Sequence, residues 1–163
     1  MTDASPVERI AAALIGRGET LALVECTLGG ALGGALTEVA GASAWFVGGV
    51  APYATVAKER LLGLSGADFG DEGAVSARGA RLMAEATRTR LGATWAFAET
   101  GIAGPRGQRR SAKEPGTAFF CLVGPDGAAH ERTVRTGQDA RAPNRRAFLA
   151  AALDLLVERL SAV

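Results

Sequence analysis

The chain has very little of three things that mark common classes of protein: cysteine, histidine and net charge. Its 163 residues include two cysteines, Cys26 and Cys121, and one histidine. Two cysteines are too few for a disulfide scaffold, and one histidine cannot anchor the usual zinc sites. A formal charge of +1 gives no reason to expect nucleic acid or an anionic membrane as a partner. We therefore expect no metal, no cofactor and no nucleic-acid or membrane partner.

Long apolar segments are also missing. No run reaches the roughly 18 residues that a spanning helix needs, and the N-terminus lacks a basic segment followed by an apolar one. Hydrophobic residues make up 48% of the chain and charged residues 21%, which is ordinary for a globular protein. With no visible repeat or linker, we expect a single cytoplasmic domain over residues 1–163.

Hydrophobic periodicity predicts helices and strands in alternation. A capping box at Ser5 and Glu8, with Pro6 between them, marks the first helix start. Helices are expected at 7–15, 29–39, 55–62 and 71–91, with a last one capped by Asn144; strands are expected at 20–25, 44–50, 94–98, 116–123 and 130–135. The final two strands form a hairpin, so the pattern favours a three-layer α/β/α sandwich with a mixed sheet.

Two turns are candidates for a site because ligands of open α/β sheets bind where strands end and helices begin. One is Glu25-Cys26-Thr27-Leu28-Gly29-Gly30, and the other is Thr100-Gly101-Ile102-Ala103-Gly104-Pro105. A thiol at a helix start faces unpaired N–H groups and the positive end of the helix dipole. Cys26 is therefore a candidate nucleophile, with amides of 27–30 as oxyanion donors. The alternative is that Cys26 is a small buried residue at the end of a strand.

Other side chains near these turns have two interpretations each. Lys58, with Tyr53 nearby, is either a base in a partly desolvated pocket or a solvated lysine on a short helix. Glu25 and Glu99 either orient a lysine or cap a neighbouring helix. The polar segment 106–115, which we expect to be a mobile loop, either binds a phosphate or is simply soluble; its cations are Arg106, Arg109, Arg110 and Lys113.

Five segments, taken in order, resemble the C-terminal domain family of the competence/damage-inducible protein CinA. Tyr53-Ala54-Thr55-Val56-Ala57-Lys58 resembles the family's Tyr-Ser-Asn-x-x-Lys, and Thr100-Gly101-Ile102-Ala103-Gly104-Pro105 is identical to its signature. The segments 37–46 and 73–76 and the pair Met83-Ala84 also match. The resemblance implies a CinA-like fold and deamidation of nicotinamide mononucleotide to the nicotinate nucleotide and ammonia.

The resemblance also implies roles for individual residues. The family's first motif is Glu-Ser-Cys-Thr-Gly-Gly with a serine nucleophile. Either Cys26 occupies the serine position, or the Cys-Thr pair has slid by one residue and the serine is missing. In the first case Cys26 attacks the amide while Lys58 and Tyr53 assist. The substrate-binding residues expected around them are Glu25, Thr27, Gly29, Gly30, Thr100, Gly101, Gly104, Lys113 and Arg141, with Lys113 or Arg141 on the phosphate.

Three functions follow from the resemblance and its departures. The first is the deamidase with a cysteine nucleophile. The second is an inactive relative that binds a nucleotide or regulates a partner, which the altered first motif favours. The third is a cysteine amidase with a shifted substrate, which Glu99 and the arginines of 106–110 favour, because the family usually has a small or apolar residue at Glu99. The resemblance further implies a homo-oligomer.

Overall fold

The computed structural model describes residues 4–107 and 112–161, and these form five helices and five strands with two short 3-10 turns. The helices are α1 (Pro6–Arg17), α2 (Ala31–Thr37), α3 (Thr55–Leu62), α4 (Ala77–Leu91) and α5 (Arg141–Leu160). The strands are β1 (Leu21–Glu25), β2 (Phe46–Val50), β3 (Trp95–Ile102), β4 (Thr117–Val123) and β5 (Ala129–Arg135). The expected alternation of helices and strands is confirmed.

The five strands form one mixed sheet in the order β2-β1-β3-β4-β5. β1 pairs in parallel with β2 and β3, and β4 pairs antiparallel with β3 and β5. β3 is therefore the strand at which the sheet changes from parallel to antiparallel. Because β4 runs opposite to β3, the start of β4 lies at the same edge as the ends of β1 and β3, and the 103–116 connection borders that edge.

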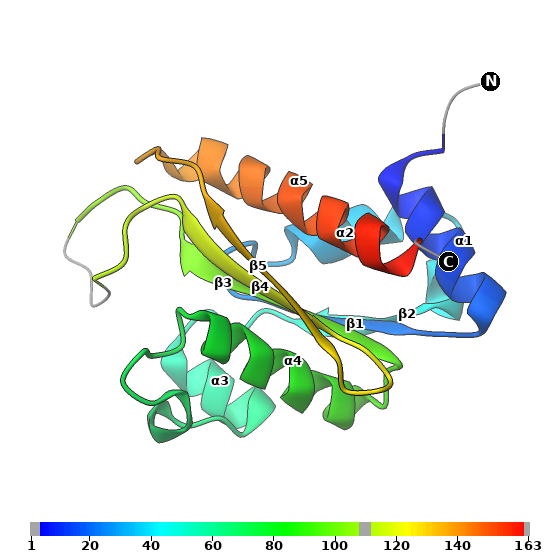
Figure 1. Ribbon diagram of the computed structural model, residues 1–163, viewed down its shortest axis with the longest axis horizontal. Coiled ribbons are helices and arrows are strands. Elements are labelled where there is room, and N and C mark those ends of the chain that lie inside the picture. Colours follow the sequence, from blue (N-terminus) through cyan, green and yellow to red (C-terminus); the bar gives the residue numbers. More distant parts are fainter. Residues whose placement is uncertain (1–3, 108–111, 162–163) are drawn as a thin grey trace.

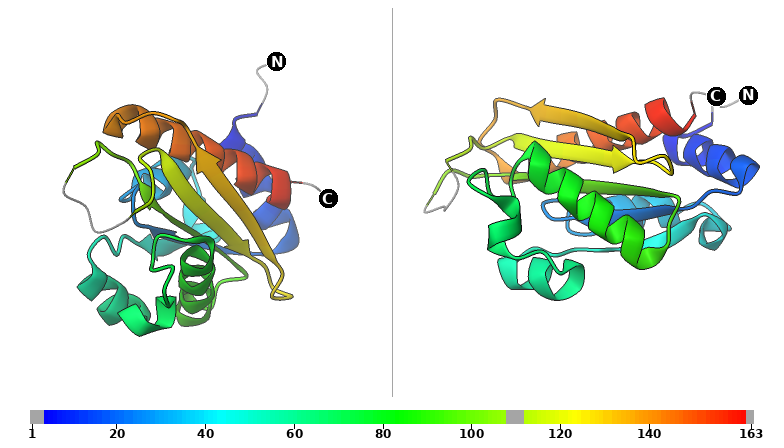
Figure 2. Two further views of the ribbon diagram at one scale, coloured as in Figure 1. Left: turned by 60° about the vertical axis from the view of Figure 1, so that its left-hand side comes forward. Right: turned by 60° about the horizontal axis from the view of Figure 1, so that its bottom comes forward.

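Helices cover both faces of the sheet, as Figures 1 and 2 show, with α1, α2 and α5 on one side and α3 and α4 on the other. The larger core joins α1, α2 and α5 to Leu21, Leu23 and Phe97 of the sheet. The smaller core joins α3 and α4 to Val24 and Ala98. Successive strand residues thus point to opposite cores, which is why β1 is buried along its whole length and apolar from Leu21 to Val24. The three-layer α/β/α architecture is confirmed.

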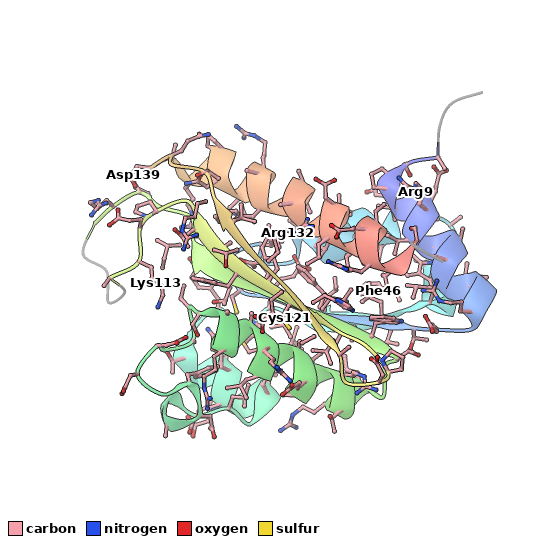
Figure 3. All side chains as sticks on the ribbon, viewed as in Figure 1. Arg9, Phe46, Lys113, Cys121, Arg132 and Asp139 are labelled. Atoms are coloured by element: carbon pink, nitrogen blue, oxygen red, sulfur yellow. The ribbon has the colours of Figure 1, made fainter. Side chains whose placement is uncertain are left out.

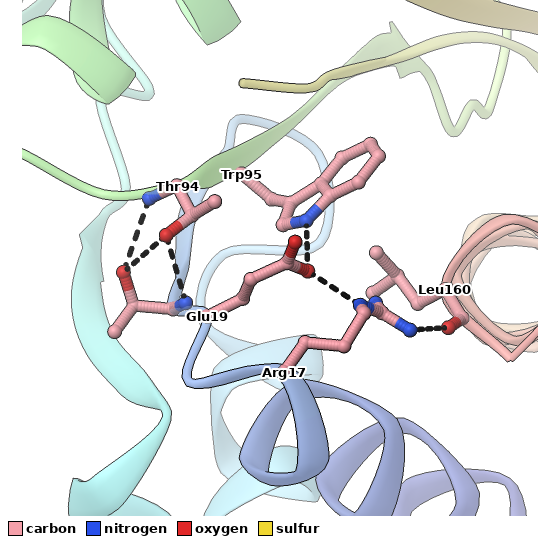
Figure 4. A network of polar contacts seen from close by, with 6 residues as sticks. Arg17, Glu19, Thr94, Trp95 and Leu160 are labelled. Carbon is pink, nitrogen blue, oxygen red and sulfur yellow. Dashed lines mark hydrogen bonds and ion pairs between the residues drawn. The ribbon is translucent and has the colours of Figure 1, made fainter. Parts of the chain in front are cut away.

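A polar network fastens α1 to the far edge of the sheet (Figure 4). Glu19 accepts hydrogen bonds of 2.8 Å from both Arg17 and the indole N–H of Trp95. Arg17 also donates to the carbonyl of Leu160 at the end of α5. The network therefore ties the two ends of the chain to the start of β3, away from the edge that carries the site.

Three expected boundaries are wrong, each for a local reason. The helix expected at 71–91 begins only at Ala77, because the side chain of Ser76 caps it by accepting from the amide of Gly79. The strand expected at 94–98 continues to Ile102, since β4 pairs with it throughout. Asn144 does not cap the last helix, which begins at Arg141; Asn144 is fully buried inside it.

The glycine pair Gly48-Gly49 of β2 has a structural role. The pairing register of β2 against β1 shifts by one residue at Val47, and this shift is a β-bulge. A Cβ on Gly49 would lie 2.9 Å from the carbonyl oxygen of Leu23, so the two backbones approach too closely for a side chain. None of the helices in the described part of the chain combines the length and apolar character that a membrane crossing needs.

Candidate active site

The two candidate turns meet at the C-terminal edge of β1 and β3. Glu25 and Glu99 are partners in the register of these strands, and the amide of Cys26 donates to the carbonyl of Glu99 at 3.1 Å. The hydroxyl of Thr27 donates to the carbonyl of Gly101 at 3.0 Å. The parallel pairing of β1 with β3 therefore brings segments 25–30 and 100–105 side by side.

A cavity of about 410 Å³ lies at this edge. Its walls come from the end of β1, the segment after β2, α3, the end of β3 with its following turn, and the start of α5. The lining residues are Cys26, Thr27, Tyr53, Lys58, Val75, Thr100, Gly101, Ile102, Ala103, Gly104, Pro105 and Arg141. Its volume is within the range of about 300–1,000 Å³ that is usual for small-molecule sites.

Cys26 lies at the inner end of the cavity and is 6% exposed. Its sulfur is 3.8 Å from the sulfur of Met83 on α4. Burial raises the pKa of the Cys26 thiol to about 12; the charge of Lys58 lowers it, that of Glu99 raises it, and a hydrogen bond from Thr100 lowers it. The resting sulfur is therefore a thiol, and a reaction at this atom has to remove its proton.

Lys58 is buried on α3, and backbone carbonyls hold its ammonium group. Its Nζ donates to the carbonyl of Pro52 at 2.9 Å and to that of Tyr53 at 3.3 Å. Of the two expected interpretations, the solvated lysine is wrong, because Lys58 is 7% exposed. Within residues 4–107 and 112–161, neither Glu25 nor Glu99 accepts a hydrogen bond from Lys58; the two carbonyls orient it instead.

Tyr53 and Arg141 meet at the outer part of the site. Arg141 donates from Nη2 to the hydroxyl of Tyr53 at 2.6 Å and from Nη1 to the carbonyl of Gly104 at 3.1 Å. The side chain of Tyr53 is largely exposed, and Arg141 is exposed as well. The pair places a cation and a phenol at the solvent side of the cavity, whereas the thiol is buried.

The two glutamates cap backbone amides. Glu25 accepts from the amides of Gly30, Leu32 and Gly33 at the start of α2, at 3.1, 2.8 and 2.8 Å. It lines a separate hollow of about 290 Å³ beside α2 and β2. Glu99 accepts from the amides of Thr27 and Leu28, both at 2.9 Å. Of the two interpretations of these residues, capping is the one that the structure supports.

This capping corrects the expected oxyanion site. The amides of Thr27, Leu28 and Gly30 already donate to carboxylates, so they do not point at the cavity as donors for a substrate. Gly29 and Gly30 have positive φ values of 59° and 99°, so their role in the turn is conformational. Both lie outside the set of described residues that line the cavity, as does Glu25.

Lys113 does not reach the cavity either. Its Nζ donates to the carbonyl of Glu72 at 3.0 Å, at a sequence separation of 41. Figure 3 places Lys113 and Asp139 toward the same end of the molecule, beside the connection that follows β3. Arg109 and Arg110 lie outside the described residues. Of the two residues expected to hold a phosphate, only Arg141 lines the cavity.

Two residues of α5 that the sequence did not indicate shape the site. Arg145 donates to the carbonyls of Thr27 and Leu28 at 3.1 and 2.6 Å. Asn144 donates from its side-chain nitrogen to the carbonyls of Ala103 and Gln138, both at 2.9 Å. The sequence shows that an arginine and an asparagine lie near the start of a helix, but it does not show which loop either residue binds.

No group of three or more His, Cys, Asp or Glu side chains in residues 4–107 and 112–161 has the arrangement of a metal site. The polar side chains that line the cavity instead carry a thiol, an ammonium, a phenol, a guanidinium and hydroxyls. Such a set is suited to nucleophilic attack and proton transfer on a small polar substrate.

Comparison with known proteins identifies the family of the chain. A sequence model of the CinA C-terminal domain matches residues 3–160. CinA-like proteins of Frankia casuarinae and Anaeromyxobacter dehalogenans are 45% and 42% identical over 91% and 90% of this chain, which spans about a third of their length. The crystal structure of a CinA superfamily protein from Klebsiella pneumoniae has a TM-score of 0.87 at 28% identity, with 96% of each chain covered. A competence/damage inducible protein from Agrobacterium tumefaciens has a TM-score of 0.81 at 32% identity, covering 97% of this chain and 98% of its own. The chain therefore belongs to the CinA C-terminal domain family.

Proposed function

We propose that the protein is an amidohydrolase that converts nicotinamide mononucleotide and water to the nicotinate nucleotide and ammonia, with Cys26 as nucleophile. The observation that carries the proposal is the cavity in which Cys26, Lys58 and Arg141 come together from three separate elements. A thiol at the inner end and a guanidinium at the outer end suit a ligand with a reactive amide at one end and a phosphate at the other.

The reaction has two stages. The sulfur of Cys26 bonds to the carboxamide carbon while its proton passes, by way of Lys58, to the amide nitrogen, and the C–N bond breaks to release ammonia. Water then attacks the thioester, the carboxylate leaves, and the thiol is restored. One water is consumed and one ammonia is released, with no change of oxidation state.

The developing oxyanion needs donors other than the amides of 27, 28 and 30. The hydroxyl of Thr100 and the ammonium of Lys58 line the same cavity as Cys26. Lys58 has three N–H bonds, and two of them donate to the carbonyls of Pro52 and Tyr53. We propose that the hydroxyl of Thr100 stabilises the oxyanion. The third N–H of Lys58 delivers its proton to the leaving nitrogen and is restored by the proton of the Cys26 thiol, and Arg141 binds the phosphate, assisted by the hydroxyl of Tyr53.

A second function, binding of a nucleotide without turnover, has two observations in its favour. Burial raises the pKa of the Cys26 thiol to about 12, which opposes formation of the nucleophilic thiolate. The amides expected to form an oxyanion hole are capped by Glu25 and Glu99. A protein of this kind would keep the cavity and Arg141 and release no ammonia.

Ammonia release from nicotinamide mononucleotide tests the two functions. The natural chain is compared with Cys26→Ala and Cys26→Ser, and with Cys121→Ala as a matched variant of the other buried cysteine. We expect turnover in the natural chain and in Cys121→Ala, and a loss of at least about a hundredfold in Cys26→Ala. Full activity of Cys26→Ala would overturn the mechanism. Binding of the nucleotide by calorimetry without ammonia release would establish the second function.

A further inference from the structure

A single residue, Glu99, holds three successive amides of the turn that carries the thiol. Its carbonyl accepts from the amide of Cys26, and its Oε2 accepts from the amides of Thr27 and Leu28. Successive backbone N–H groups in a turn form a concavity that binds anions. Here the anion belongs to the chain itself, because β3 places the Glu99 carboxylate inside the concavity.

The same carboxylate carries an unsatisfied atom. Glu99 is fully buried, and its Oε1 has no hydrogen-bond partner among the described residues. Its neighbour Glu25 adds a second negative charge at the next position of the sheet. A buried carboxylate oxygen without a partner is costly. Capping two amides requires one oxygen and no charge, so the hydrogen bonds alone do not account for a glutamate at this place.

The charge of Glu99 acts on the sulfur of Cys26. Burial raises the pKa of the Cys26 thiol most, the charge of Lys58 on α3 lowers this pKa, and the charge of Glu99 raises it further. The other charged groups at the turn are Glu25 on β1, whose oxygens bind the start of α2, and Arg145 on α5, which donates to the carbonyls of 27 and 28. Burial raises the pKa of Glu99 itself to about 7, so near neutral pH its charge is partly present.

We propose that Glu99 is a positioning residue for Cys26, with two separable actions: its Oε2 fixes the turn through the amides of Thr27 and Leu28, and its carboxylate, held against that turn, opposes a second negative charge on the Cys26 sulfur. A protonated thiol resists adventitious oxidation and alkylation, and it keeps the proton that the departing ammonia needs. This inference rests on the proposed role of Cys26 as nucleophile, but its test requires no turnover.

Two substitutions separate the actions. Glu99→Gln keeps an oxygen for both amides and removes the charge, whereas Glu99→Leu removes both at similar volume. The measurement is the rate of iodoacetamide alkylation of Cys26 against pH, resolved by peptide mass spectrometry, in the full chain. We expect Glu99→Gln to raise the Cys26 rate at about pH 8 by up to about tenfold, since one pKa unit changes the thiolate fraction tenfold.

Hydrogen exchange tests the other action. We expect the amides of Thr27 and Leu28 to keep their protection in Glu99→Gln and to lose about tenfold or more in Glu99→Leu. The rate of Cys121 in the same digest is an internal reference, because that thiol is fully buried and its charged neighbours are Glu131, Arg81 and Glu85. Glu131→Gln is the matched control for loss of one carboxylate, and it should leave the Cys26 rate unchanged.

Equal Cys26 rates in the natural chain and Glu99→Gln, with the Cys121 rate constant, would overturn the electrostatic action. Unchanged exchange of the two amides in folded Glu99→Leu would overturn the hydrogen-bond action. Neither result depends on ammonia release, so a chain that shows both effects but no turnover would refute the proposed enzyme and leave the role of Glu99 intact.

Discussion

The guanidinium of Arg141 lies 2.6 Å from the hydroxyl of Tyr53, to which it donates a hydrogen bond, and both residues line the cavity that holds Cys26. They are 88 residues apart in the chain. The contact joins the start of α5 to the segment after β2 and orients the guanidinium on the solvent side of the cavity. This arrangement presents a positive charge at the solvent side of the cavity.

Substitution of Arg141 by lysine should weaken substrate binding. Lysine keeps the positive charge but cannot donate simultaneously to Tyr53, to the carbonyl of Gly104 and to a phosphate in the planar geometry of arginine. We expect KM for nicotinamide mononucleotide to rise about tenfold with a smaller change in kcat, as measured by steady-state ammonia release.

The matched control is Arg146→Lys, on the same helix α5 but outside the cavity lining. It should leave KM unchanged. Equal KM values for Arg141→Lys and the natural chain would remove Arg141 from the phosphate site.

Stability should depend on pH through Glu99. The pKa of Glu99 is about 7 in the folded chain against an ordinary value of 4.5, so between these pH values the folded chain binds more protons than the unfolded chain. This contribution to stability is therefore greatest below about pH 4.5 and is lost as the pH rises toward 7. The loss is on the order of 3 kcal/mol at most.

Urea unfolding at about pH 5 and about pH 8 measures this change. Glu99→Gln has no titrating group here, so its stability should vary less between the two conditions than that of the natural chain. An identical difference in both proteins would show that Glu99 is not the group responsible.

Substitution of two glycines by alanine should change the stability of the fold in opposite directions. A Cβ on Gly101 would lie 2.6 Å from the carbonyl oxygen of Thr117 and 2.9 Å from the Cβ of Ala118, both in the adjoining strand. Gly101→Ala should therefore separate β3 from β4 and destabilise the fold by about 2 kcal/mol or more.

Gly34 lies within α2, and a Cβ there would meet nothing within 4 Å. Gly34→Ala should stabilise the chain by about 0.5–1 kcal/mol, because alanine is the better helix former. Thermal unfolding of both variants decides the matter, and a destabilised Gly34→Ala together with a neutral Gly101→Ala would contradict the packing described above.

Local signals predicted the fold well. The capping box of Ser5 and Glu8 forms as expected, and the apolar run at Leu21–Glu25 is a strand buried on both faces. These features depend on residues a few positions apart, which is why their patterns are visible in one sequence.

The site was predicted less completely because its contacts join distant residues. The strand-end rule brought Cys26 and Thr100 together, the residues after the second strand indicated Lys58 as a candidate base, and the resemblance to the family added Arg141. What Glu99 and Arg145 bind depends on which face of the sheet and which side of a helix meet the turn, and periodicity does not specify this. The capped amides at Thr27 and Leu28 overturned the expected oxyanion hole for the same reason.

Two residues bind the turn that carries Cys26: Glu99 accepts from its amides, and Arg145 donates to its carbonyls. Thr27 is separated from Glu99 by 72 positions in the sequence and from Arg145 by 118. Contacts of such separation form late, when most of the chain has already been ordered. We expect the sheet to assemble before the turn acquires its final shape, so that reactivity appears only at the last step of folding. An incompletely folded chain would then carry Cys26 on a turn without its native conformation. A substitution that detaches α5 from this turn would abolish the reactivity of Cys26 while most of the secondary structure persists.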